Sequence, residues 1–125
     1  MKFGWVTLIV NNFDDTLKFY KEVVGLKLVT MINNAGDGGR IAFLGDQGTK
    51  IQILEHKDIK HVSMGRQIYL GFTVDSLADT IEHLKSNQVK IHSGPFQPSP
   101  DVRFIYVLDP NGLKVQFAQI LNHIF

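Results

Sequence analysis

Four side chains of this 125-residue chain combine a chemically useful type with a regular spacing. Gln52 and Gln116 lie 64 positions apart, and the same interval separates Trp5 from Tyr69. A glutamine amide offers a hydrogen-bond donor and an acceptor, while an indole or a phenol offers an aromatic ring with a polar tip. These side chains predict a site that stacks and orients a flat or apolar ligand. A structural role stays open, because the amides could bond to each other and the rings could fill the space instead.

The sequence lacks the residue combinations that common catalytic and cofactor sites require. There are no cysteines, which excludes disulfides, thiolate metal ligands and a cysteine nucleophile. The glycine-rich segment 36–39 has no Lys-Ser/Thr after it, so it is not a phosphate-binding loop. Four histidines have no carboxylate or nucleophile at a telling spacing: His61, His83, His92 and His123. We therefore predict no catalytic residue and no cofactor.

Charge and hydropathy argue against two classes of partner. The net charge is +1, from 13 basic and 12 acidic residues, which favours neither nucleic acid nor an anionic membrane. No apolar run approaches the roughly 20 residues of a membrane-spanning helix. Residues 1–6 lack the apolar stretch of a signal peptide. We expect a cytoplasmic protein without a nucleic-acid or membrane partner.

The first half of the chain reads as one strand, one helix and three further strands. Asn11 and Asn12 offer a helix N-cap, two acidic residues follow in the first turn, and Gly25 suits the position after the helix. The predicted strands are 3–10, 26–32, 40–44 and 50–54. Residues 33–39 are rich in Gly, Asn and Asp and predict a loop.

The second half repeats this order after a polar connector. Asp75 and Ser76 predict the start of a helix, and Pro95, Pro98 and Pro100 predict a loop over residues 93–101. The predicted strands are 67–74, 89–92, 102–108 and 113–119.

A constant interval of 64 residues relates the two halves without a gap. It superimposes strand on strand, helix start on helix start and turn on turn, so we infer an internal duplication. The predicted fold class is α+β: two tandem βαβββ modules, related by a pseudo-two-fold axis, whose curved mixed sheet surrounds a cavity. The predicted segments are a first module at 1–55, a connector at 56–66, a second module at 67–119 and a C-terminal tail at 120–125.

Side-chain alternation along the strands assigns one face to the helices and the other to a concave surface. In the third strand of the first module it turns Ile41 and Phe43 toward the helix and Arg40 and Ala42 away from it. Arg40 is expected at the mouth of the cavity, where a guanidinium would attract an anionic or carbonyl-bearing ligand. The predicted ligand-binding residues are Trp5, Thr7, Arg40, Gln52, Tyr69, Phe104, Tyr106 and Gln116.

Three motifs give the chain a resemblance to a known family. Phe19-Tyr20 lies inside the first helix, Val24-Gly25-Leu26 ends it, and Asp109-Pro110-Asn111-Gly112 forms a turn between the last two strands. With the paired modules, these motifs resemble the vicinal oxygen chelate superfamily of glyoxalase I, bleomycin resistance proteins, extradiol dioxygenases and fosfomycin resistance enzymes. The resemblance implies a soluble fold of this type from Phe3 to Gln119.

The same resemblance bears on metal binding. Metal enzymes of that superfamily take His or Glu ligands from four strand positions, which Trp5, Gln52, Tyr69 and Gln116 occupy in this chain. An indole N–H only donates, and two neutral amides bring no negative charge to a dication. We therefore predict no metal at these positions.

Three functions follow from these features. The first is a metal-free protein that binds a small aromatic or amphipathic molecule without chemistry, in the manner that the resemblance to bleomycin resistance proteins implies. The second is a metal-dependent lyase, isomerase or dioxygenase with unusual ligands, and the third is a structural or interaction module with a filled cavity. The resemblance and the open sheet edges also imply a homodimer.

Overall fold

The computed structural model describes residues 1–35, 38–59 and 61–122. The chain divides into two compact units, Met1–Ser63 and Met64–Phe125, and each is described by itself. Residues 123–125 of the predicted C-terminal tail lie outside the described residues, as do residues 36–37 of the predicted loop and residue 60 of the predicted connector. No helix among the described residues is long and apolar enough to cross a membrane.

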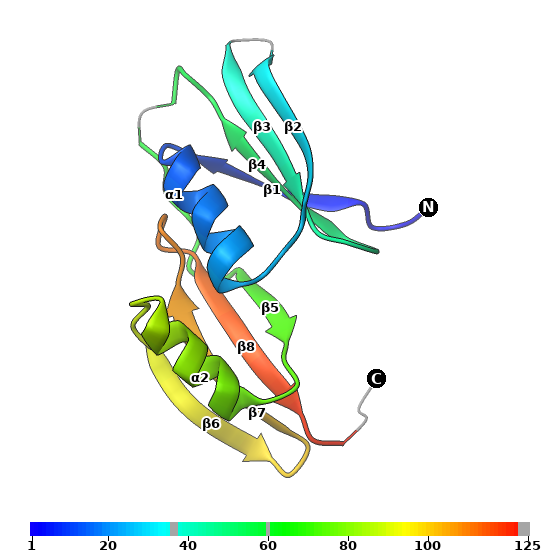
Figure 1. Ribbon diagram of the computed structural model, residues 1–125, viewed down its shortest axis with the longest axis vertical. Coiled ribbons are helices and arrows are strands. Elements are labelled where there is room, and N and C mark those ends of the chain that lie inside the picture. The colour runs from blue at the N-terminus through cyan, green and yellow to red at the C-terminus, as the bar shows by residue number, and fades with distance from the viewer. Residues whose placement is uncertain (36–37, 60, 123–125) are drawn as a thin grey trace. The chain divides into compact units, whose positions relative to one another are not determined.

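The first unit is a four-stranded mixed sheet with one helical segment on one face (Figure 1). The strand order is β1-β4-β3-β2, with β1 parallel to β4 and the other pairs antiparallel. The elements in chain order are β1 (Trp5–Val10), α1 (Phe13–Lys18), the π-helix η1 (Phe19–Val23), β2 (Leu28–Ala35), β3 (Gly39–Leu44) and β4 (Lys50–Glu55). This is the predicted βαβββ order.

The ends of the first helical segment follow its sequence signals in part. Asn12 is the N-cap residue, as predicted, but its side chain caps no backbone N–H; its Oδ1 accepts a hydrogen bond from Thr16 Oγ1 at 2.8 Å. Gly25, with φ +88°, follows the last turn, and the N–H of Leu26 donates to the Tyr20 carbonyl at 2.9 Å. Glycine adopts the left-handed conformation after a helix at a lower energetic cost than other residues do, because it has no Cβ.

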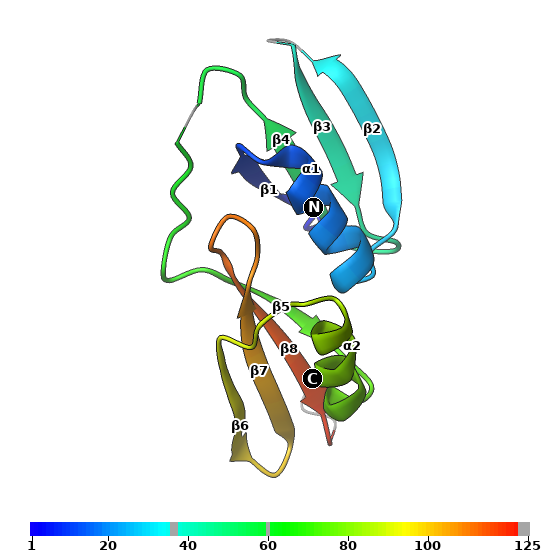
Figure 2. The ribbon, with the colours of Figure 1, turned by 60° about the vertical axis from the view of Figure 1, so that its left-hand side comes forward.

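The second unit repeats the architecture (Figure 2). Its strand order is β5-β8-β7-β6, with β5 parallel to β8. The elements are β5 (Tyr69–Thr73), α2 (Leu77–Ser86), β6 (Ser93–Ser99), β7 (Val102–Leu108) and β8 (Lys114–Ile120). The predicted helix start is confirmed, because Ser76 Oγ accepts a hydrogen bond from the Asp79 N–H at 3.1 Å.

The strand β6 corrects the sequence-based prediction. We expected a strand at 89–92 and a proline-containing loop at 93–101, whereas the strand runs from Ser93 to Ser99. β6 is the outer strand of its sheet, and its pairing with β7 is irregular on both sides of Phe96. Prolines are tolerated on an edge strand because one side of that strand needs no ladder hydrogen bonds.

In each unit a helical segment lies against one face of the sheet (Figures 1 and 2), and the buried side chains lie between the two. In the first unit the buried side chains come from β1, α1, η1, β3 and β4: Leu8, Val10, Phe13, Phe19, Tyr20, Ala42, Leu44, Ile51 and Ile53. In the second they come from α2, β7 and β8 and the turn before β8: Leu77, Leu84, Ile105, Val107, Leu113, Val115 and Phe117. Within the described parts of the chain, the other face of each sheet carries no helix of its own unit, and we call it the helix-free face.

The internal repeat contains a one-residue difference that the sequence comparison did not show. In the ladders, Leu44 pairs with Ile51, whereas the equivalent Val107 pairs with Val115, so one more residue lies between these equivalent partners in the second unit. A shift of one residue turns every side chain of a strand to the opposite face. β3 is therefore inverted relative to the prediction: Ala42 is buried in the core, and Phe43 lies on the helix-free face.

Candidate functional site

The helix-free face of the first unit carries an aromatic pair beside a hydrogen-bonded polar pair. The rings of Trp5 and Phe43 meet edge to face with centroids 5.5 Å apart, and Trp5 remains 55% exposed. Next to them, Thr7 Oγ1 donates to Gln52 Oε1 at 2.6 Å. Parallel pairing of β1 with β4 brings Thr7 opposite Gln52, so the contact follows from the register. The polar atoms of this face are thus partly engaged with each other.

The helix-free face of the second unit is more aromatic. Tyr69 and Tyr106 have ring centroids 5.3 Å apart, and Tyr69 is 46% exposed. Phe104 and Phe96 extend the cluster along β7 and β6, with Phe104 5.4 Å from Tyr106 and 5.6 Å from Phe96. The Lys114 ammonium lies 4.8 Å from the Tyr69 ring centroid and 5.0 Å from that of Tyr106. Aromatic faces and a cation placed in this way can stack a flat ligand and attract negative charge.

Gln116 differs from Gln52 in having an unengaged amide. In β5, the residue opposite Gln116 is Gly71, where the first unit has Thr7 opposite Gln52. A Cβ at position 71 would lie 3.6 Å from Gln116 Oε1, so the glycine leaves open the space that a side chain would occupy. Within the described part of the chain, no hydrogen bond engages the Gln116 amide. Its donor and acceptor are available to a ligand.

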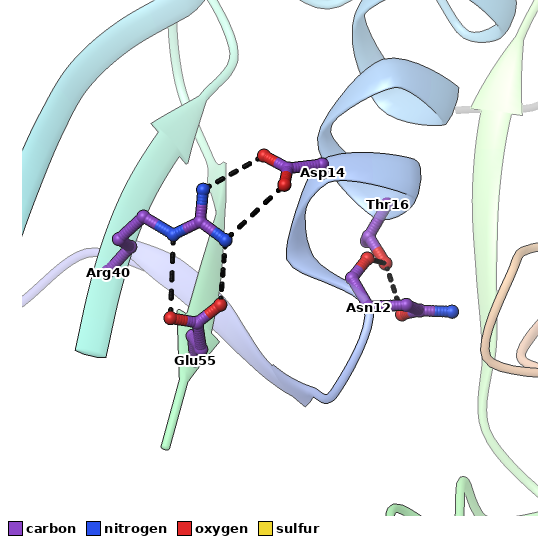
Figure 3. A network of polar contacts seen from close by, with 5 residues as sticks. All are labelled: Asn12, Asp14, Thr16, Arg40 and Glu55. Atoms are coloured by element: carbon purple, nitrogen blue, oxygen red, sulfur yellow. Dashed lines mark hydrogen bonds and ion pairs between the residues drawn. The ribbon is translucent and has the colours of Figure 1, made fainter. Parts of the chain in front are cut away.

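The position predicted for Arg40, on the helix-free face, is wrong. Figure 3 shows its guanidinium between β4 and α1, where Nη1 lies 2.9 Å from Asp14 Oδ1 and Nη2 lies 2.8 Å from Glu55 Oε2. The guanidinium carbon is 4.4 Å from the ring centroid of Phe13, at the start of α1. Hydrogen bonds to Glu55 and then to Asp14 raise the pKa of Arg40 above its ordinary value. Arg40 therefore ties the helix to the sheet on the core side.

Sequence reasoning missed two aromatic side chains of these faces. Phe43 was assigned to the core because the pairing register of the hairpin could not be read from the sequence, and Phe96 was assigned to a loop because prolines surround it. The face assignments of the other predicted residues agree with the ladders: Trp5, Thr7 and Gln52 in the first unit, and Tyr69, Phe104, Tyr106 and Gln116 in the second. Their roles in binding stay predictions.

The four positions that resemble a metal site do not fit a dication. Trp5 has only an N–H donor, Gln52 Oε1 already accepts from Thr7, and Tyr69 is a phenol whose ring is engaged by Lys114. Across residues 1–35, 38–59 and 61–122, His, Cys, Asp and Glu side chains do not gather in groups of three that could hold a metal. A divalent cation is ordinarily held by imidazole, carboxylate or thiolate ligands.

A family model decides the relationship that the motifs suggested. The Glyoxalase/Bleomycin resistance protein/Dioxygenase superfamily matches residues 2–117. The chain belongs to this superfamily. The paired βαβββ modules and the resemblance stated from the turn and helix motifs are thereby confirmed.

Individual members of the superfamily are similar along most of the chain. Lactoylglutathione lyase of Neisseria meningitidis is 26% identical over 119 residues, which cover 90% of this chain and 86% of that protein. Among solved structures, trypanothione-dependent glyoxalase I of Leishmania major has a TM-score of 0.80 at 17% identity, covering 95% of this chain and 86% of the other. TnmS3, an antibiotic binding protein from Streptomyces sp. CB03234, has a TM-score of 0.76 at 18% identity and covers 96% of each. At these identities the structural likeness shows the fold alone.

Proposed function

We propose that this superfamily member binds a small flat or amphipathic organic molecule on its helix-free faces, without metal chemistry. The unengaged amide of Gln116 beside the Tyr69–Tyr106 pair carries the proposal. A ligand there stacks on the tyrosines and exchanges hydrogen bonds with the amide, which combines apolar contact with orientation. The likeness in fold to an antibiotic binding protein supports a role in binding.

The first experiment identifies the ligand. Native mass spectrometry of the purified protein, under gentle and then stripping conditions, reports chain stoichiometry, bound metal and any retained organic molecule together. We expect an organic adduct without a stoichiometric dication. If none is retained, a library of aromatic compounds is screened by the emission of Trp5, the single tryptophan, which lies on the first helix-free face and is half exposed.

A designed substitution then tests the site without deleting its key residue. Gly71→Thr copies the Thr7–Gln52 arrangement, so the new hydroxyl engages Gln116 Oε1 and competes with the ligand. We expect Gly71→Thr and Gln116→Ala each to weaken binding about fivefold, the equivalent of about 1 kcal/mol for one hydrogen bond. Isothermal calorimetry measures the change.

The matched control for these variants is Gln52→Ala. Because Gln52 Oε1 already accepts from Thr7, its removal should weaken binding less than Gln116→Ala does. Full affinity in folded Gln116→Ala and Trp5→Ala variants would remove the helix-free faces from consideration and favour an interaction module with a filled face.

A second candidate function is suggested by the names of the similar curated proteins. Several of them are lactoylglutathione lyases, including that of Haemophilus influenzae at 25% identity. Formation or cleavage of S-lactoylglutathione, with and without added Zn²⁺ or Ni²⁺, tests this directly. Turnover that depends on a stoichiometric metal would replace the binding function with an enzymatic one, despite the poor ligand set at the four positions.

A further inference from the structure

Each unit has a hollow of about 360 Å³ that lies wholly within that unit. The first is lined by residues of the N-terminal segment, the start of β1, β2, β3 and the β3–β4 connection with the start of β4: Lys2, Gly4, Trp5, Val29, Thr30, Phe43, Gly48 and Lys50. The second is lined by residues before β5, before β6 and around the β7–β8 turn: Met64, Gly65, Arg66, His92, Leu108, Gly112 and Lys114. Both hollows are large enough for a small organic molecule.

The lysine and arginine side chains of the two hollows occupy equivalent positions of the repeat. Lys2 corresponds to Arg66 and Lys50 to Lys114, each at the 64-residue interval that relates the units. Each hollow therefore combines one cation before the first strand of its unit with one at the start of the last strand. In each unit an aromatic pair adjoins them, since Trp5 and Phe43 line the first hollow and Lys114 lies over two tyrosine rings.

These cations are not neutralised by neighbouring carboxylates. Among the described residues, Lys2, Lys50, Arg66 and Lys114 form no ion pair, in contrast to Arg40. The acidic residue of the β7–β8 turn is engaged by its own backbone: Asp109 Oδ1 accepts from the N–H of Asn111 at 2.8 Å and from that of Leu113 at 2.9 Å. Among the residues that the structure describes, neither hollow has an acidic residue in its lining. Each keeps an uncompensated positive charge next to apolar rings.

We propose that each unit binds one organic oxyanion in its hollow, with the carboxylate or phosphate between the two basic side chains and the flat body against the adjoining aromatic pair. The inference rests on the proposed binding function and names its ligand class: an aromatic molecule with a negatively charged substituent. Two cations in a part-apolar setting suit such a group, because charge-assisted hydrogen bonds orient the anion while ring contact supplies affinity.

Probes of one shape and different charge test the inference on the full chain. Two-dimensional ¹H–¹⁵N NMR follows titrations with 1-naphthoate, 1-naphthyl phosphate and the uncharged 1-naphthamide. We expect both anions to shift the backbone amide signals around Lys50 and those around Lys114. Each anion should bind with roughly fivefold higher affinity than 1-naphthamide does. Comparison of the two anions shows whether a carboxylate or a phosphate fits better. Raising the salt concentration should weaken the binding of the two anions and leave the binding of 1-naphthamide unchanged.

Variants assign the charge to its residue, and the duplicated arrangement supplies an internal control. Lys114→Gln should reduce 1-naphthoate affinity in the second unit to that of 1-naphthamide and leave the first unit unaffected, and Lys50→Gln should do the reverse. The matched surface control is Arg103→Gln. Position 103 pairs with Gln119, whose side chain accepts a hydrogen bond from the N–H of Leu77 at the start of α2. Arg103 therefore lies on the helix side of the sheet and faces away from the hollow. That variant should bind all three probes as the parent does.

The possible results separate this inference from the binding function. Equal affinity for the anions and 1-naphthamide at these amide positions would overturn the anion assignment while leaving ligand binding in place. Shifts outside both hollows, or no binding of any probe, would overturn the inference, and the latter result would count against the binding function too. An unchanged response in folded Lys114→Gln and Lys50→Gln would exclude these side chains as anion partners.

Discussion

Arg40 shows, at the scale of the residue, how strongly the role of a side chain depends on its direction. On the helix-free face it would meet a ligand, whereas the actual contacts are with Asp14 and Glu55 and with the ring of Phe13 (Figure 3). The guanidinium is about one-third exposed, so solvent screens its ion pairs. The planar group nevertheless engages two carboxylates and a ring at once, which a lysine could not reproduce.

Replacing Arg40 should therefore lower stability and leave binding unchanged. We expect Arg40→Met to reduce the free energy of unfolding by about 1–2 kcal/mol, from two partly exposed ion pairs and one cation–π contact. Arg40→Lys, which keeps the charge but not the planar fork, should lose less. Urea unfolding measures stability, and titration with the identified ligand measures binding. A loss of affinity in Arg40→Lys without a loss of stability would return Arg40 to the ligand-binding residues.

The raised pKa of Arg40 sets the sign of the pH dependence of this contribution. A group whose pKa is higher in the folded state contributes its stability fully below the unfolded value and loses it only as the pH rises through the folded value. The titration of Arg40 should therefore not reduce the difference in unfolding free energy between the parent protein and Arg40→Met as the pH is raised from 7 to 10. A steady decline over that range would show that other groups control this contact.

At the scale of the element, the sequence predicted the strands better than it predicted their registers. Side-chain alternation correctly placed Gln52 and Gln116 on the helix-free faces. Their strands, β4 and β8, lie inside the sheets, and β1 and β5 pair with them in parallel. The faces of β3 were predicted the wrong way round because they depend on the pairing register of a hairpin, which differs by one residue between the units. Composition does not reveal such a difference.

The prediction of a loop in place of β6 was wrong for another reason. Local signals from Pro95 and Pro98 predicted a loop, but pairing with β7 outweighs them at a sheet edge. A strand with such a sequence is specified by its tertiary contacts more than by the propensities of its own residues. Because β6 supplies Phe96 to the aromatic cluster, the extent of the candidate site could not be predicted either.

The end of the first helical segment gives a prediction at this scale. Gly25 has φ +88°, and nothing lies within 4 Å of where a Cβ would be, so an added methyl group meets backbone strain alone. We expect Gly25→Ala to lower the free energy of unfolding by about 1 kcal/mol. Gly65→Ala, also without neighbours within 4 Å but without a left-handed φ, is the matched control and should change stability by less than about 0.5 kcal/mol. Equal effects would mean that Gly25 can leave its conformation cheaply.

At the scale of the whole molecule, duplication explains both the likeness and the difference of the two units. Trp5 with Phe43 corresponds to Tyr69 with Tyr106, so an aromatic pair exists in both. The polar partners have diverged, because Thr7 satisfies Gln52 whereas Gly71 leaves Gln116 available. A duplicated scaffold can keep its core while one copy changes its surface, since fold and site depend on different residues.

Exposed apolar side chains support the prediction of a homodimer. Phe3 is 69% exposed, Ile68 62% and Trp5 55%, and β1 and β5 are outer strands of their own sheets. Large apolar side chains and unpaired strand edges favour association with a second copy. Sedimentation velocity over a concentration series should give twice the chain mass of 14.1 kDa, and added salt should not dissociate the dimer because apolar contact is not screened. A single 14.1 kDa species at every concentration would contradict the prediction, and dissociation by salt would assign the contact to charged residues instead.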